Sequence, residues 1–262
     1  MNKINQLFAN NKDRKLLSLY FCAGHPTLEG TVQVIKTLAD KGIDMIEIGI
    51  PFSDPMADGP VIQDAATKAL RNGMTLKKLF GQLENIRQEN VEIPLILMGY
   101  LNPIMQYGFE EFCKSCVNCG IDGVIVPDLP YEEYDEINGT AEQYGIIPIS
   151  LVTPVSFERT GKIASQAKGF LYCVSSTGVT GVRDNLNTNL SGFFDTVKEY
   201  SKVPNMLGFG ISKPEQAREI RKYADGIIVG SAIVRLIDEE DRAGSTAKIA
   251  ELTASLRAAL DE

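Results

Sequence analysis

The sequence lacks an excess of basic residues, and it lacks any long apolar run. Its 262 residues carry 26 lysines and arginines against 34 aspartates and glutamates, which gives a formal net charge of −8. Nucleic acids and anionic membranes require a basic surface, so this charge argues against either as a partner. No apolar run approaches the length of a membrane span. Residues 1–15 lack the apolar core of a signal peptide, and their apolar spacing instead predicts a short amphipathic helix.

Histidine is nearly absent, and the cysteines are poorly spaced for a metal site. The one histidine, His25, lies in a Gly-His-Pro turn, where we expect a loop residue and not a ligand. Cys113, Cys116 and Cys119 have a regular spacing, but three-residue steps drift around a helix and no fourth cysteine is near. We therefore expect no metal. The odd total of five cysteines, without a secretion signal, predicts a cytoplasmic location.

Apolar runs rich in β-branched residues alternate with amphipathic stretches along the whole chain. The expected strands are Leu16–Gly24, Asp44–Phe52, Pro94–Tyr100, Gly123–Leu129, Ile146–Val152, Gly169–Ser175, Val203–Gly210 and Ala224–Gly230. The expected helices lie at about 29–41, 59–72, 76–89, 109–119, 131–144, 156–167, 190–201, 213–222 and 246–260.

This alternation predicts an α/β fold of the (β/α)8 TIM-barrel class. We expect a single domain over residues 1–262, with extra N-terminal and loop helices. A doubly wound open sheet is the alternative, but it usually has fewer strands and a glycine-rich turn after the first one. Residues 23–26 instead read Ala-Gly-His-Pro, and no linker-like segment divides the chain.

Two carboxylates lie in and after the second expected strand. Glu47 lies within an isoleucine-rich run and shares a face with Gly49, and Asp58 follows in the next loop. An ionised glutamate is almost never buried without a partner. Glu47 could therefore close a structural salt bridge while Asp58 caps the following helix. Alternatively, both acids face one ligand at the end of the barrel where chemistry is expected.

Three glycine-containing segments follow the last three expected strands, at residues 176–181, 208–212 and 229–232. Backbone N–H groups at the start of a short helix bind anions, and glycine lets an anion approach closely. Phosphate sites of this kind recur after the seventh and eighth strands of barrels. The glycines could also serve only as caps and turns, but three at adjacent strand ends favour a phosphate.

Several chemistries are excluded by the residues that the chain does not have. A Schiff-base aldolase needs a lysine inside the barrel, and none of the expected strands contains one. A metal-dependent aldolase needs several histidine or carboxylate ligands on one ion. No G-x-S-x-G elbow or Cys–His pairing is evident either. What remains is carboxylate acid–base catalysis on a phosphorylated organic molecule.

Four motifs together resemble one known family. The segment EIGIPFSDPMADGP at 47–60, with IQDA at 62–65, closely resembles the signature of the tryptophan synthase α subunit family. SSTGVTG at 175–181, GFGIS at 208–212 and GSAIV at 230–234 follow in the family's order. The resemblance implies retro-aldol cleavage of indole-3-glycerol phosphate to indole and glyceraldehyde 3-phosphate. It also implies a β subunit partner in an α2β2 complex, with pyridoxal phosphate on that partner and no cofactor on this chain.

The resemblance also assigns roles to individual positions. It implies that Glu47 protonates indole C3 and then accepts the side-chain hydroxyl proton, while Asp58 accepts the indole N–H. The implied substrate-binding residues are Tyr20, Tyr100, Ile125, Leu129, Tyr172 and Thr180, and the implied phosphate-binding residues are Gly181, Gly210, Gly230 and Ser231. The implied partner surface includes Pro51, Asp54, Pro55, Asn102, Pro103 and Pro130. Segment 177–189 resembles the family's mobile loop and would close over ligand.

Two departures from the family pattern and two other functions are weighed against this interpretation. Gly99 and Pro127 alter pocket walls without removing a catalytic group. The chain could instead be a phosphate-sensing partner that activates a β subunit without catalysis. It could also be another phosphosugar barrel enzyme of the same pathway. The presence of both Glu47 and Asp58 favours the lyase over the sensor.

Overall fold

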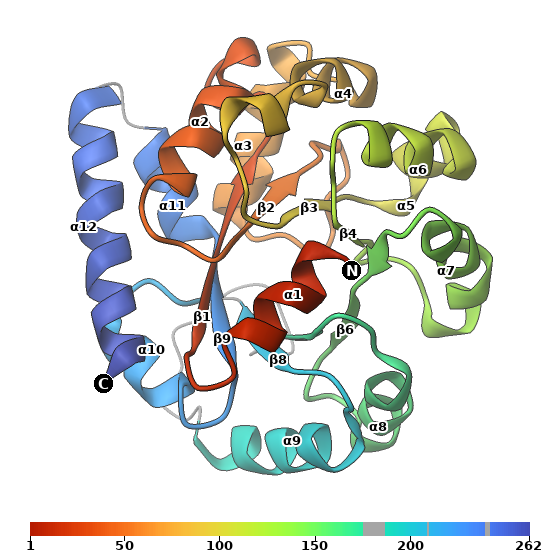
Figure 1. Ribbon diagram of the computed structural model, residues 1–262, viewed down its shortest axis with the longest axis vertical. Helices are drawn as coiled ribbons and strands as arrows, with labels where there is room; N and C mark the ends of the chain where they lie inside the picture. Colours follow the sequence, from red (N-terminus) through yellow and green to blue (C-terminus); the bar gives the residue numbers. More distant parts are fainter. Residues whose placement is uncertain (175–186, 209, 239–241) are drawn as a thin grey trace.

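Nine short segments form the parallel strands of one sheet, counted over the residues that the structure describes, namely 1–174, 187–208, 210–238 and 242–262 (Figure 1). This computed structural model has β1 (Leu16–Cys22), β2 (Met45–Gly49), β3 (Leu95–Met98), β4 (Gly123–Ile125), β5 (Ile147–Pro148), β6 (Ser150–Val152), β7 (Leu171–Val174), β8 (Asn205–Gly208) and β9 (Gly226–Val229). Their order is β5-β4-β3-β2-β1-β9-β8-β7-β6. Because only Ile149 separates β5 from β6 in the chain, the two ends of the sheet meet in a barrel.

The fifth expected strand, 146–152, is the one that the structure divides in two. Its first part, β5, pairs with β4, and its second part, β6, pairs with β7. Pro148 has no N–H to continue a ladder, while the amide of Ile149 donates to Val124 O at 2.8 Å. The strand thus changes neighbours at Ile149. The (β/α)8 barrel predicted from the sequence is confirmed, with its fifth strand interrupted.

Helices surround the barrel on the outside, and the first of them lies across one of its ends (Figure 1). They are α1 (Lys3–Asn10), α2 (Thr31–Ala39), α3 (Pro60–Arg71), α4 (Leu76–Leu83), α5 (Leu101–Tyr107), α6 (Phe109–Asn118), α7 (Tyr134–Gln143), α8 (Phe157–Gln166), α9 (Asn187–Tyr200), α10 (Pro214–Ile220), α11 (Ser231–Ile237) and α12 (Arg242–Asp261), with 3₁₀ turns η1 (Leu28–Gly30), η2 (Ile86–Glu89) and η3 (Tyr131–Glu133). None of the helices in the described ranges has the length and apolarity to span a membrane.

One helix, α5, was not expected from the sequence. Its Asn102-Pro103 pair resembles a loop, because proline usually interrupts a helix. Pro103, however, lies in the first turn of α5, where a helix needs no backbone N–H donor. The helix therefore forms, and it carries part of the predicted partner surface.

The N-terminal helix α1 closes the end of the barrel at which the strands begin (Figure 1). Asn2 caps this helix, and its side-chain amide also donates to Asp122 O at 2.7 Å. Ile4 is fully buried, and its side chain lies against Gly123, where a Cβ would be only 2.8 Å from Ile4 Cδ1. Helix α1 thus covers this end of the barrel, and Ile4 fills the space beside Gly123.

An aspartate precedes three of the strands and binds the backbone of a neighbouring strand. Asp44 Oδ2 accepts the amide of Leu17, and Asp122 Oδ2 accepts the amide of Leu95. Asp225 Oδ2 accepts the amide of Asn205 in the same way. These bonds join the start of one strand to the start of the next, so they fix the strand register at the closed end of the barrel.

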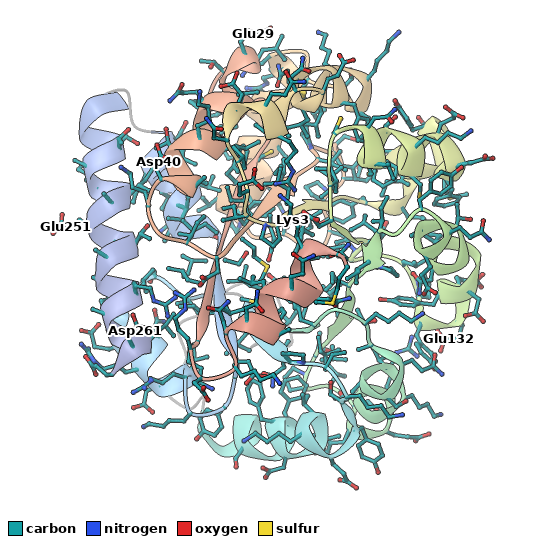
Figure 2. All side chains as sticks on the ribbon, viewed as in Figure 1. Lys3, Glu29, Asp40, Glu132, Glu251 and Asp261 are labelled. Atoms are coloured by element: carbon teal, nitrogen blue, oxygen red, sulfur yellow. The ribbon has the colours of Figure 1, made fainter. Side chains whose placement is uncertain are left out.

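Charged side chains otherwise lie at the periphery, as Figure 2 shows for Glu29, Glu132 and Glu251. Four acidic side chains are exceptions: Asp44, Asp58 and Asp122 are buried, and Glu47, in β2, is fully buried. Its register partner on β1 is Tyr20, and residues paired in this way point to the same face of a parallel sheet. A carboxyl group therefore lies among the residues that fill the barrel.

The closed end of the barrel generates a prediction about stability. The Asp44 carboxylate binds Arg14, Arg257 (3.0 Å) and the Leu17 amide, and its side chain is only 4% exposed. Asp44→Ala leaves these donors unpaired, so we expect a loss of about 3 kcal/mol in the free energy of unfolding measured by urea denaturation. Asp225→Ala is the matched control, and because its side chain is 48% exposed it should lose clearly less. Equal losses would contradict the assigned role of Asp44.

Candidate active site

Glu47 projects from β2 into the barrel and is 0% exposed. The Ser18 hydroxyl donates to Glu47 Oε1 at 3.1 Å, and Glu47 Oε2 is buried without a hydrogen-bond partner. Burial raises the pKa of Glu47 to about 8, while the Ser18 hydrogen bond acts in the opposite direction. Glu47 is therefore a carboxyl group that holds its proton near neutral pH and has one oxygen free to transfer it.

Asp58 lies in the loop between β2 and α3 and is 6% exposed. The Tyr100 hydroxyl donates to Asp58 Oδ2 at 3.0 Å and accepts the amide of Ala57 at 3.0 Å. The ring of Tyr100 in turn stacks on Phe52, with 5.3 Å between centroids. Burial raises the pKa of Asp58 to about 6, and the Tyr100 hydrogen bond opposes this shift. Asp58 is thus held in a fixed orientation and is mostly ionised at pH 7.

Two tyrosines lie within electrostatic reach of both acids. Burial raises the pKa of Tyr20 well above its usual value, and the charges of Asp58 and Glu47 raise it further. Burial also raises the pKa of Tyr172, and Glu47 and Asp58 again add to the shift. Tyr20 is on β1 and Tyr172 is on β7. The two acids therefore face the same region inside the barrel from different elements.

Glycines make room for these tyrosines on the neighbouring strands. A Cβ at Gly49 would overlap the hydroxyl of Tyr20, and a Cβ at Gly208 would overlap the hydroxyl of Tyr172. In both cases the tyrosine reaches over the glycine that ends the adjacent strand. The glycine at each of these strand ends thus leaves the space that the tyrosine side chain of the adjacent strand occupies.

The described residues of the expected phosphate site lie at the ends of β8 and β9. Gly210 is exposed and has a φ of +78°, which favours glycine. Gly230 precedes α11, and a Cβ there would be 3.6 Å from Tyr20 Cδ1, so it lies next to the acid-containing region. Ser231 begins α11 and is exposed. Thr180 and Gly181, together with most of segment 177–189, lie outside the described residues.

Two of the predicted pocket residues, Ile125 and Leu129, lie in different surroundings. Ile125 ends β4 and is fully buried, in register with Met98 of β3. Leu129 instead lines a small cavity with Val124 and with Tyr134 of α7. Val124 points to the opposite side of β4 from Ile125. Leu129 therefore packs under α7, and its predicted place in the indole pocket is not supported.

Most of the predicted partner surface is accessible, with one exception. Asp54, Asn102 and Pro130 are exposed, and Pro55 and Pro103 are half-buried. Pro51 is buried, because it directly follows Ile50, whose amide still bonds to Met98 O at 2.7 Å. Pro51 is therefore removed from the surface.

Sequence reasoning missed four residues in these regions. Met56 and Met105 are 76% and 56% exposed beside the predicted partner residues. Ser18 binds Glu47, and the Ala57 amide orients Tyr100. The only signal for Ser18 in the sequence is a hydroxyl in an apolar strand, on the same face as Tyr20.

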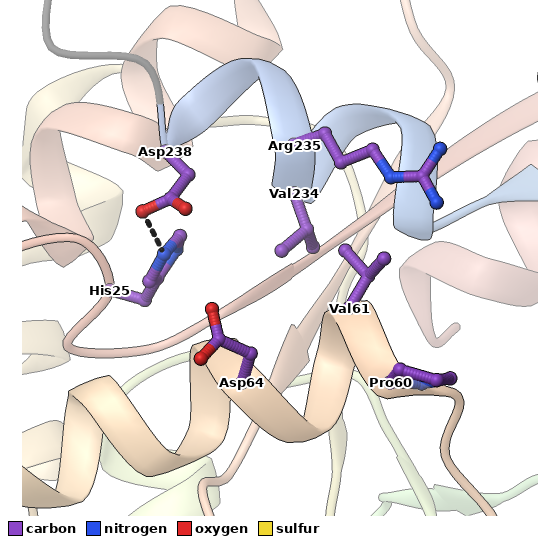
Figure 3. A pocket seen from close by; sticks show the side chains of 7 residues that line it. All are labelled: His25, Pro60, Val61, Asp64, Val234, Arg235 and Asp238. Atoms are coloured by element: carbon purple, nitrogen blue, oxygen red, sulfur yellow. Dashed lines mark hydrogen bonds and ion pairs between the residues drawn. The ribbon is translucent and has the colours of Figure 1, made fainter.

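A separate cavity of about 280 Å³ lies between α3 and α11, and neither Glu47 nor Asp58 lines it (Figure 3). His25 lines this cavity and is 1% exposed, and its Nε2 lies 3.0 Å from Asp238 Oδ1. Asp238 Oδ2 also binds Lys68 Nζ at 2.6 Å. Burial lowers the pKa of His25, and Asp238 opposes the shift. No group of three or more candidate ligands for a metal occurs within the described part of the chain.

Comparison with known proteins agrees with this geometry. The model of the family described as "Tryptophan synthase alpha chain" matches residues 7–261. The tryptophan synthase alpha chain of Bacteroides thetaiotaomicron is 56% identical over 243 residues, covering 92% of this chain and 94% of that relative. The one from Phocaeicola vulgatus is 54% identical over 254 residues, covering 96% and 97%.

A solved structure gives the same result. The crystal structure of tryptophan synthase subunit alpha from Legionella pneumophila str. Paris matches with a TM-score of 0.88 at 39% identity, covering 100% of this chain and 99% of that one. With two buried acids facing one region of a (β/α)8 barrel, these similarities show that the chain belongs to the tryptophan synthase α chain family, the lyases that cleave indole-3-glycerol phosphate to indole and glyceraldehyde 3-phosphate.

Proposed function

We propose that Glu47 and Asp58 carry out this cleavage from opposite ends of one indole ring. The observation that carries the proposal is their shared environment. Both acids are buried and both have a raised pKa. The charges of both also raise the pKa values of Tyr20 and Tyr172. Neither forms an ion pair with a cation among those found in the described ranges. Buried acids left without cations are typical of a catalytic site.

Glu47 is proposed to move two protons in turn. The carboxylic acid first gives its proton from Oε2 to indole C3, which places a positive charge on the ring. The resulting carboxylate then accepts the proton of the hydroxyl on the adjoining side-chain carbon. The bond between that carbon and C3 breaks, and its electron pair returns to the ring. Indole leaves, the carbon becomes the aldehyde of glyceraldehyde 3-phosphate, and Glu47 regains its proton.

Asp58 is proposed to accept a hydrogen bond from the indole N–H. Its carboxylate would stabilise the positive charge that develops on this nitrogen when C3 is protonated. The Tyr100 hydroxyl holds Oδ2 at 3.0 Å, so Oδ1 is the oxygen available to the substrate. Tyr20, Tyr172 and Ile125, all buried, would form the apolar walls around the ring.

The phosphate of the substrate is proposed to bind at the ends of β8 and β9. Gly210, Gly230 and Ser231 would offer backbone N–H groups there, together with Gly181, while Thr180 is proposed to bind the rest of the substrate. Gly230 lies against Tyr20, which supports one continuous site from the acids to the phosphate.

A β subunit is the partner proposed for the segments that follow β2, β3 and β4. The accessible residues Asp54, Pro55, Asn102, Pro103 and Pro130 would form this surface. Met56 and Met105 add exposed apolar side chains beside them, and such side chains at the end of a barrel favour a protein partner. We propose that pyridoxal phosphate is carried by that partner and that this chain needs no cofactor. The five free cysteines agree with the proposed cytoplasmic location.

The proposed role of Glu47 predicts the result of Glu47→Gln. Amide substitution keeps the shape and removes the transferable proton, so kcat for indole release should fall by about 10²–10⁴-fold. Folding should not suffer. The pKa of Glu47 is about 8 in the folded chain against an ordinary 4.5, so the wild type loses stability as pH rises between these values, whereas glutamine does not titrate. Rapid turnover by a folded Glu47→Gln chain would refute the assignment.

The two raised pKa values predict a bell-shaped pH profile for kcat/KM. Activity should fall below about pH 6 as Asp58 gains a proton, and above about pH 8 as Glu47 loses its proton. Tyr100→Phe removes the hydrogen bond that lowers the pKa of Asp58, so it should move the acid limb to higher pH. Tyr107→Phe, which removes a hydroxyl bound to Ser115, is the control and should leave both limbs unchanged. An unmoved acid limb in Tyr100→Phe would argue against Asp58 as the group titrating there.

The proposed partner surface predicts that Met105→Glu weakens binding to the β subunit by about tenfold or more, because it places a charge in an apolar contact. Indole release by the isolated variant should be unchanged. Val117→Glu is the matched control, because Val117 is also exposed, at 47%, but lies in α6. Binding can be measured by titration calorimetry. Equal affinities for both variants would exclude Met105 from the interface.

A further inference from the structure

A buried hydroxyl lies beneath the acid that is proposed to transfer protons. Ser18 is in β1 and is 0% exposed, like Glu47 itself. Its hydroxyl donates to Glu47 Oε1 at 3.1 Å, between the adjacent strands β1 and β2. A buried serine hydroxyl usually bonds to backbone or to another neutral group. Here its partner is the carboxyl group of Glu47, the proposed proton donor.

The two oxygens of Glu47 are treated differently. Oε1 accepts the Ser18 hydrogen bond, whereas Oε2 is buried with no hydrogen-bond partner. The other titratable groups that face Glu47 are Tyr20 from β1 and Tyr172 from β7. Both are neutral at ordinary pH, because their pKa values are raised. The carboxyl group is therefore anchored at one oxygen and unconstrained at the other.

The register of the strands gives the direction of this anchor. Ser18 is paired with Met45, while Glu47 is paired with Tyr20. Ser18 consequently lies two residues, or about 6–7 Å, nearer to the closed end of the barrel than Glu47 does. The hydrogen bond thus holds the carboxyl group from the side of the closed end. The phosphate-binding glycines and Asp58 lie at the other end, where the strands finish.

We propose that Ser18 is a positioning residue for the cleavage, which holds Glu47 Oε1 from the closed end of the barrel so that Oε2 exchanges protons with the substrate. This inference rests on the proposed catalytic role of Glu47. Ser18 does not touch the substrate and acts only through the carboxyl group.

The same hydrogen bond has an electrostatic consequence that separates this role from simple packing. The Ser18 donor lowers the pKa of Glu47 against the larger effect of burial. Removing the donor should therefore raise the pKa of Glu47 further. A serine that merely fills space would change stability when replaced, but it would leave this pKa where it is.

Ser18→Ala is the test, assayed with the full chain by indole release between pH 5 and 10, a range that spans both pKa values. We expect kcat to fall about tenfold with KM changed by less than about twofold, because only the alignment of Glu47 is lost. The alkaline limb should move up by about 0.5–1 pH unit. Ser18→Thr, which keeps the hydroxyl, should restore the limb. Ser18→Cys, close in volume with a weaker donor, should fall between them.

Ser150→Ala is the matched control. Ser150 is also a buried serine on a barrel strand, 3% exposed, but its partner is the hydroxyl of Tyr134. This variant should lose stability and keep the wild-type alkaline limb. Ser18→Ala also removes a buried atom and can lose stability for that reason. Ser18→Cys allows the alkaline limb to be measured in a chain whose packing is nearly unchanged.

A measurement without turnover distinguishes failure of this inference from failure of the proposed function. The infrared carboxyl band that disappears in Glu47→Gln reports protonation of Glu47 directly, and its midpoint should rise in Ser18→Ala. An unmoved midpoint and limb in both Ser18→Ala and Ser18→Cys, with Glu47→Gln inactive, would overturn the role of Ser18 alone. Activity in Glu47→Gln would instead overturn the catalytic role on which it rests.

Discussion

The site proposed in this barrel depends on one carboxyl group buried without a cation. Glu47 is surrounded by strands, and its hydrogen-bond partner among the described residues is the hydroxyl of Ser18. Burial favours its neutral form, whereas Asp58, fixed by Tyr100 nearer the surface, keeps a lower pKa of about 6. Two carboxyl groups in one site thus differ in protonation at neutral pH because their surroundings differ. A proton donor and a negative charge are thereby available to the same molecule.

The two ends of the barrel have separate tasks. At the closed end, Asp44, Asp122 and Asp225 bind the backbone of neighbouring strands, and α1 fills the opening. At the open end, Gly49 leaves space for a tyrosine hydroxyl, and the loops carry Asp58 and the glycines. The closed end thus holds the strands together, while the open end carries the buried acids and the glycines of the proposed site.

Much of the fold could be predicted because its signals are local. Apolar runs that alternate with amphipathic stretches give the strands, the helices and the barrel class. The interrupted fifth strand could not be predicted, because the change of neighbours at Ile149 depends on where β4 and β7 lie. Helix α5 was not among the expected helices, and its Pro103 is acceptable because it lies in the first turn.

The sequence by itself determined the motif around Glu47 and Asp58, the family, and therefore the reaction. Those signals are residue types in a fixed order, and they need no knowledge of distance. Only the tertiary structure decided that Ser18 meets Glu47 and that Leu129 and Pro51 turn away from their expected places. Ser18 and Glu47 are 29 positions apart. Their contact arises from the register of β1 on β2, and register is fixed by the packing of the closed barrel.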